Sequence, residues 1–162
     1  MTGVMYNTKM TGVIRQNGGY CMKKERNIYT LPAISLFVLG ILDLIRGFFH
    51  TFNIRWAAEN VARLDLSAAG NDQLVLLGSF GLSNFLTGII FICISLKVKR
   101  IAPYIILFIP LSYALGIIGL KLSQVSREAA FNGQYFMFAY IGFCILVFIK
   151  FLYDKRTEKI KI

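Results

Sequence analysis

The chain has 162 residues, of which 56% are hydrophobic and only 16% are charged, whereas soluble globular proteins carry about 25% charged residues. The apolar residues fall in long blocks rather than at amphipathic intervals, which matches them to lipid and excludes a soluble enzyme. The formal charge of +10 does not indicate nucleic-acid binding, because the basic residues lie at the edges of the apolar blocks and not on one helix with interleaved aromatics.

The N-terminal segment differs in character from the remainder. Residues 1–21 have no sustained period and no apolar block, so we interpret them as disordered or as a mis-assigned start. Met22 followed by two lysines is typical of a natural beginning. Residues 22–162 are then expected to form a single membrane domain. The first apolar block contains charged residues and no convincing cleavage site follows it, which favours a retained anchor over a signal peptide.

Four apolar blocks are each close to the ~20 residues that a helix needs to cross ~30 Å of hydrocarbon. They cover about residues 31–52, 74–96, 101–120 and 134–153. The turn between the second and third blocks is only a few residues long, which predicts that these two helices are antiparallel neighbours. The sequence therefore predicts an all-α fold, an integral membrane four-helix bundle with four transmembrane helices.

The basic residues alternate between the two sides of this predicted bundle. Five precede the first block, three lie in the second connection and five lie at the C-terminus, whereas only four lie in the first and third connections. Cytoplasmic segments carry the excess of Lys and Arg in membrane proteins. This distribution predicts a multi-pass plasma-membrane protein with both termini cytoplasmic.

The first connection is long enough to hold a further short helix. Arg55, Glu59 and Arg63 repeat at four-residue spacing, while apolar residues occupy another face: Ile54, Ala58, Val61 and Ala62. This pattern predicts a short amphipathic helix at the outer surface between the first two spans.

Small residues recur at three- and four-residue intervals in the blocks. The set comprises Gly40, Gly47, Gly78, Gly81, Gly88, Ser112, Gly116 and Gly119. Such stripes let helix backbones approach closely in membranes, so we predict a helix-packing role. The functional alternative is a stripe that lines a substrate path.

A short internal resemblance connects the first two blocks, which run in opposite directions across the membrane. Both blocks carry two glycines that enclose two polar residues at the same spacing: Gly40, Asp43, Arg46 and Gly47 against Gly81, Asn84, Thr87 and Gly88. Inverted repeats build transporter sites near the middle of the bilayer. The spacing therefore raises duplication as an alternative to coincidence.

The polar residues of the first block share one helix face. Together with Gly40 and Gly47, the three residues Asp43, Arg46 and His50 occupy about a third of the helix circumference at 100° per residue. An ionised side chain in mid-membrane costs ~2.5–3.5 kcal/mol on insertion scales, so Asp43 and Arg46 are expected to form an ion pair that faces the bundle interior. The pair could serve a functional site, or it could only fix the helix register, with His50 merely interfacial.

Depth along the helices brings further polar residues to the same level. At 1.5 Å per residue, Asp43 and Tyr113 each lie ~18 Å from the inner edge, and Asn84 lies ~15 Å from the outer edge. Tyr140 falls close to the level of Arg46. These depths predict a polar layer through the bundle that opens outward at His50.

Three functions are compatible with this layer. The leading hypothesis is a non-enzymatic protein in which the layer serves transport, proton-linked conformational change or partner binding. A membrane-embedded enzyme acting on a lipid headgroup near the outer surface, and an accessory subunit of a larger complex, are the alternatives. One histidine and three scattered cysteines predict no metal site, and no motif indicates a cofactor. The expected partners are the lipid bilayer, and another copy of the chain or another membrane protein.

Overall fold

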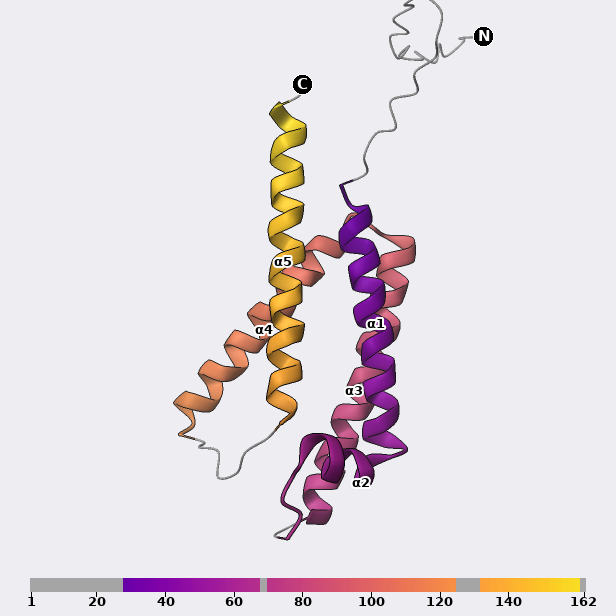
Figure 1. Cartoon of the computed structure of the whole chain (residues 1–162), viewed down its shortest axis with the longest axis vertical. Coiled ribbons are helices and arrows are strands. Elements are labelled where there is room, and N and C mark those ends of the chain that lie inside the picture. The colour runs from indigo at the N-terminus through magenta and orange to yellow at the C-terminus, as the bar shows by residue number, and fades with distance from the viewer. Residues whose placement is uncertain (1–27, 68–69, 125–131, 161–162) are drawn as a thin grey trace, which may run out of the picture.

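The computed structural model describes residues 28–67, 70–124 and 132–160 (Figure 1). Within these residues the fold is entirely helical, with four long helices: α1 (Thr30–Thr51), α3 (Gly70–Lys97), α4 (Ala102–Leu122) and α5 (Gly133–Ile160). All four are long and apolar enough to cross a membrane, which confirms the prediction of four long apolar helices and fits a multi-pass membrane protein. Residues 1–21, predicted to be disordered or a mis-assigned start, lie outside the described residues.

Helices α1 and α3 pack against each other along their length, far more extensively than any other pair of elements (Figure 1). Helix α5 packs on α4 and more lightly on α1. The core between these three helices is formed by Ala33, Leu36 and Leu39 of α1, Ala102 and Ile106 of α4, and Cys144 and Val147 of α5. Helix α1 is therefore the element that contacts all the others.

Helix α4 leaves the bundle after its first turns. Its buried residues are Ala102, Pro103 and Ile106, and the helix then runs obliquely away from α3 (Figure 1). Helices α3 and α4 barely touch, so the prediction that they are antiparallel neighbours is wrong. The short turn fixes only the ends that it joins, whereas the direction of α4 follows from the packing of its start on α1. The expected bundle is open between α3 and α4.

The first connection forms two short helical segments, α2 (Ile54–Trp56) and the wider-turn η1 (Ala57–Ala62). Arg55 and Glu59 form an exposed ion pair at 3.9 Å. Ala57, Ala58 and Ala62 are buried, but Val61, predicted on the apolar face, is exposed. The prediction assumed the residue spacing of an α-helix. The wider π-helical turn of η1 places the side chains at other angles around the helix axis. Whether this segment lies outside the cell stays a prediction.

Backbone contacts end η1 and tie it to α5. Arg63 adopts a left-handed conformation with φ of 52°, and the Leu64 N–H donates to the Ala58 carbonyl at 2.9 Å, as in a Schellman cap. The Asn132 N–H donates to the Ala62 carbonyl at 3.2 Å. The segment between α1 and α3 is thereby held beside the start of α5.

The chain crosses the molecule in alternating directions. Helix α1 begins and α5 ends at the same end of the molecule, while α2 and η1 lie at the other end (Figure 1). The two basic clusters, which follow α3 and end α5, therefore share an end with the start of α1. Which end faces the cytoplasm, and in which membrane, stay predictions from the charge distribution.

Candidate functional site

The candidate site is built on a very close contact between α1 and α3. A Cβ atom added to Gly40 would lie 2.9 Å from the Gly88 carbonyl oxygen, and one added to Gly88 would lie 2.8 Å from the Gly40 carbonyl oxygen. A Cβ on Gly47 would lie 3.0 Å from the Gly81 carbonyl oxygen. Only glycine lets the two backbones approach this closely, because any side chain would enter the partner helix.

These contacts are reciprocal about the middle of the α1–α3 interface. Gly81 follows Gly40 by 41 residues, and Gly88 follows Gly47 by the same offset. Applying this offset exchanges the Gly40–Gly88 contact with the Gly81–Gly47 contact. The two helices are thus related by a local two-fold axis perpendicular to their length.

Apolar contacts obey the same relation. A Cβ on Gly88 would meet the Leu44 side chain at 2.9 Å, and a Cβ on Gly47 would meet the Phe85 side chain at 3.2 Å. Phe85 is the counterpart of Leu44 at the 41-residue offset. The spacing shared by the first two apolar blocks is therefore matched by a shared contact pattern, with one helix inverted relative to the other.

The polar residues lie at the centre of this arrangement. The Thr87 hydroxyl donates to Oδ2 of Asp43 at 3.3 Å, and Nη2 of Arg46 donates to Oδ1 of Asn84 at 3.2 Å. The 41-residue offset exchanges Asp43 with Asn84 and Arg46 with Thr87, so these two hydrogen bonds are counterparts. One pair carries the negative charge and the other carries the positive charge.

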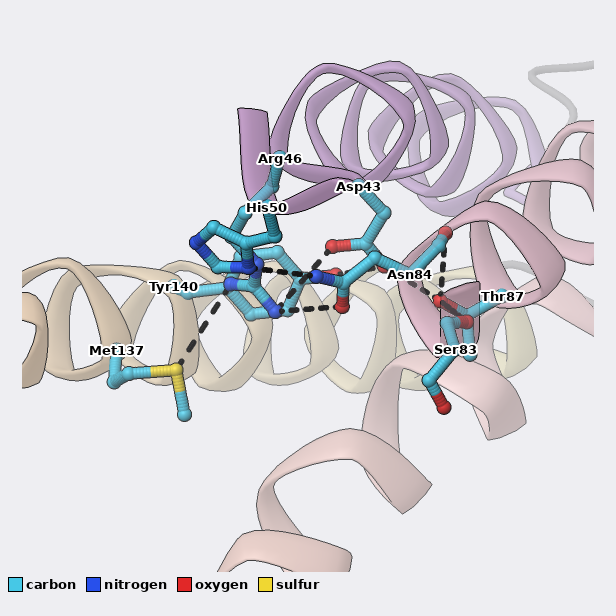
Figure 2. A network of polar contacts seen from close by, with 8 residues as sticks. All are labelled: Asp43, Arg46, His50, Ser83, Asn84, Thr87, Met137 and Tyr140. Atoms are coloured by element: carbon cyan, nitrogen blue, oxygen red, sulfur yellow. Dashed lines mark hydrogen bonds and ion pairs between the residues drawn. The ribbon is translucent and has the colours of Figure 1, made fainter. Parts of the chain in front are cut away.

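Asp43 is buried among groups from three helices. Its side chain is only 6% exposed. The Tyr140 hydroxyl of α5 donates to Oδ2 at 3.4 Å, beside the bond from Thr87 of α3. Among the described residues Oδ1 has no hydrogen-bond partner, and it lies 3.8 Å from Nη2 of Arg46. The carboxylate thus anchors α1, α3 and α5 to one another (Figure 2).

Arg46 is the more accessible member of the pair, with 32% of its side chain exposed. Besides Asn84, its guanidinium contacts the Met137 sulfur at 3.9 Å and lies over the Tyr140 ring, 5.9 Å from the ring centroid. Its Nε has no hydrogen-bond partner within the part of the chain that the structure describes. Sulfur is a weak acceptor, so much of the donor capacity of the guanidinium is unused.

His50 lies one step further along the same polar chain. Its Nδ1 is 3.4 Å from Nδ2 of Asn84, and Asn84 in turn accepts from Arg46. The polar contacts that link His50 to Asp43 therefore run through the side chains of Asn84 and Arg46 (Figure 2). It approaches the polar layer, yet it is not among the residues that line the cavity beside that layer.

A cavity of about 390 Å³ opens beside the ion pair, between α1, α3, α4 and α5. Its polar lining comes from all four helices: Asp43, Arg46, Asn84, Thr87, Ser112, Tyr113 and Tyr140. Its apolar lining comes from α3 and α4: Phe91, Ile105, Phe108 and Ile109. Helices α3 and α4 both line the cavity but make few contacts with each other, so the cavity lies where these two helices diverge.

The structure brings together five of the six residues predicted for the polar layer around one cavity: Asp43, Arg46, Asn84, Tyr113 and Tyr140. Sequence reasoning missed Thr87 and Met137 as members of this layer. Thr87 carried a detectable signal, because it follows Asn84 by three residues and so shares its helix face. Met137 carried none, since an apolar side chain in a span is ordinary.

The predicted packing residues fall into two groups. Gly40, Gly47, Gly81 and Gly88 lie at the α1–α3 contact, and Gly78 faces Ile54 of α2 at 3.4 Å. A Cβ on Gly116 or Gly119 would meet nothing within 4 Å among the described residues, so within this part of the chain neither residue packs against another helix. Ser112, on the same helix, instead lines the cavity.

Comparison of the chain with protein families, with curated proteins and with solved structures found no match in any of the three. The geometry of the cavity and its side chains therefore carries the functional argument.

Proposed function

We propose that this protein binds an amphipathic molecule taken from the bilayer, with the polar group of that molecule at the Asp43–Arg46 pair and its apolar part along the α3 and α4 walls. The observation that carries this proposal is the cavity between the diverging helices α3 and α4, which joins a charged, hydrogen-bonding end to an apolar wall. Its volume falls in the range of about 300–1,000 Å³ that is usual for small-molecule sites.

The arrangement of the ion pair favours a binding role over a purely structural one. A pair that served only helix register would be enclosed by its neighbours. Here Arg46 keeps 32% of its side chain exposed and lines the cavity with Asn84 and Tyr113. A ligand that enters between α3 and α4 would meet these groups directly.

A non-enzymatic role fits this site better than catalysis on a lipid headgroup. The enzyme hypothesis relied on Arg46 and His50 acting together near the outer surface. His50 contacts Asn84 and does not line the cavity in which the ligand would lie. Transport of the bound molecule, proton-linked movement and service as an accessory subunit stay predictions from the sequence.

Photolabelling would test this function. The protein would be reconstituted in phosphatidylcholine nanodiscs with a 16-carbon fatty acid that carries a diazirine on its chain, irradiated and digested. We expect the label to concentrate on peptides that contain Phe91 and Phe108, above the level on the outer faces of α1 and α5.

Two tryptophan variants of α4 provide the matched comparison. Ser112→Trp would fill the cavity that Ser112 lines. Gly116→Trp adds the same side chain one turn further along, where no described residue lies within 4 Å of an added Cβ. The first variant should lose the concentrated labelling and the second should retain it. Uniform labelling around the wild-type protein, or equal labelling of both variants, would refute the proposed site.

A further inference from the structure

We propose that the amphiphile is an anion, and that Arg46, Ser112 and Tyr113 bind its carboxylate or phosphate group. This inference rests on the proposed function and assigns the charge of its ligand. It follows from which donors and acceptors around the cavity are already engaged and which are left unused.

The positive charge of the pair is more accessible than the negative charge. The Asp43 side chain is 6% exposed and the Arg46 side chain is 32% exposed. Oδ2 of Asp43 accepts from Thr87 and Tyr140, and its Oδ1 faces Arg46. A cationic ligand would have to displace Arg46 from this carboxylate, whereas an anionic ligand could add to the open side of the guanidinium.

Arg46 retains donors for such an anion. A guanidinium has five N–H groups, and the hydrogen-bond partners of Arg46 in the described chain are one amide oxygen and one thioether sulfur. The ion-pair distance of 3.8 Å to Asp43 is too long for a hydrogen bond. Carboxylate and phosphate oxygens are the acceptors that a guanidinium binds best, often with two parallel bonds.

Two hydroxyl groups on α4 complete a donor set across the cavity. Ser112 and Tyr113 both line it, and neither hydroxyl forms a hydrogen bond with another residue in the described parts of the chain. Both hydroxyls can donate to an anion. Helix α4 therefore contributes donors opposite Arg46, while Ile105, Phe108 and Ile109 of the same helix contact the chain of the ligand.

Competition against the photolabel tests the charge of the ligand. Four 16-carbon competitors would be compared in phosphatidylcholine nanodiscs: hexadecanoate, hexadecyl phosphate, hexadecanol and hexadecyltrimethylammonium. We expect at least one anion to compete at a concentration about tenfold or more below the alcohol and the cation, since hydrogen bonds to charged groups contribute enough for that difference. The stronger of the two anions identifies carboxylate or phosphate, and a parallel arm with phosphatidylglycerol in the nanodisc separates a resident lipid from a single-chain molecule.

Variants test whether Arg46, Ser112 and Tyr113 cause the preference for anionic competitors. Arg46→Gln should abolish the advantage of the anions, and Arg55→Gln, which removes an exposed arginine paired with Glu59, should retain it. If Arg46→Gln does not fold, Ser112→Ala combined with Tyr113→Phe keeps the ion pair and should reduce the advantage about threefold or more. A preference for the alcohol or the cation, or an anion preference unchanged in these variants, would overturn this inference. Absence of cavity labelling both by the fatty acid and by the corresponding uncharged diazirine alcohol would instead refute the proposed function.

Discussion

Replacing Gly40 with alanine should force α1 and α3 apart. The new Cβ would lie 2.9 Å from the Gly88 carbonyl oxygen and 3.2 Å from the Ile92 backbone nitrogen. Both neighbours are backbone atoms, so no rotamer change relieves the contact. Restoring ordinary separation would require the helices to move by about 0.5 Å, which weakens the dispersion contacts along the interface. We expect a loss of about 1–3 kcal/mol in the free energy of unfolding, as for other overpacked contacts.

Gly116→Ala provides the matched control, because it adds the same methyl group to a helix position where nothing in the described ranges lies within 4 Å. Alanine has the higher helix propensity, so this variant should be neutral or up to about 1 kcal/mol more stable. Unfolding in mixed micelles can be followed through Trp56, the single tryptophan of the chain, whose ring lies 5.6 Å from that of Phe49. Equal stability of the two variants would show that the α1–α3 contact is not as close as described.

Three further predictions concern topology, the N-terminus and the ion pair. Reporter fusions after Arg100 and at the C-terminus should read as cytoplasmic and fusions near Ala69 and Gly133 as external, because of the distribution of basic residues; a cytoplasmic reading at Ala69 would contradict this orientation. Removing residues 1–21 should leave membrane insertion unchanged, since basic residues before the first span remain, and a fractionation assay would reveal any loss. A double-mutant cycle of Asp43→Ala and Arg46→Ala should show a coupling of about 0.5–3 kcal/mol in unfolding experiments, and additive effects would mean that the two residues do not interact.

The sequence was sufficient to predict four long apolar helices and most of the polar residues that line the cavity. The length of an apolar block and the rise of 1.5 Å per residue are local properties, so Asp43, Asn84 and Tyr113 could be assigned to one level without any knowledge of packing. These quantities do not specify which helices are neighbours. The separation of α3 from α4 depends on where Ala102 and Ile106 pack, which is a tertiary property.

Side-chain exposure was predicted less well than depth. Val61 was assigned to an apolar face on the assumption of α-helical winding, and the wider turn of η1 exposes it. The cavity could not be predicted from the periodicity of the sequence either, because it arises from the oblique path of α4. A hydrophobic pattern indicates which side chains are kept away from water. In a membrane it does not show whether such a side chain contacts lipid or a neighbouring helix.

Because α1 and α3 are related by a local two-fold axis, their backbone arrangement could hold the charged residues on either helix. Exchanging Asp43 with Asn84 and Arg46 with Thr87 would regenerate the two hydrogen bonds between α1 and α3 with the helices interchanged, because each of these two bonds is the counterpart of the other. Which helix carries the charges, and on which side of the helix pair the cavity lies, consequently depend on a few side chains and on the packing of α4 and α5 on α1. The backbone of such a helix pair is symmetric, and the differences in sequence between its two helices make the site asymmetric.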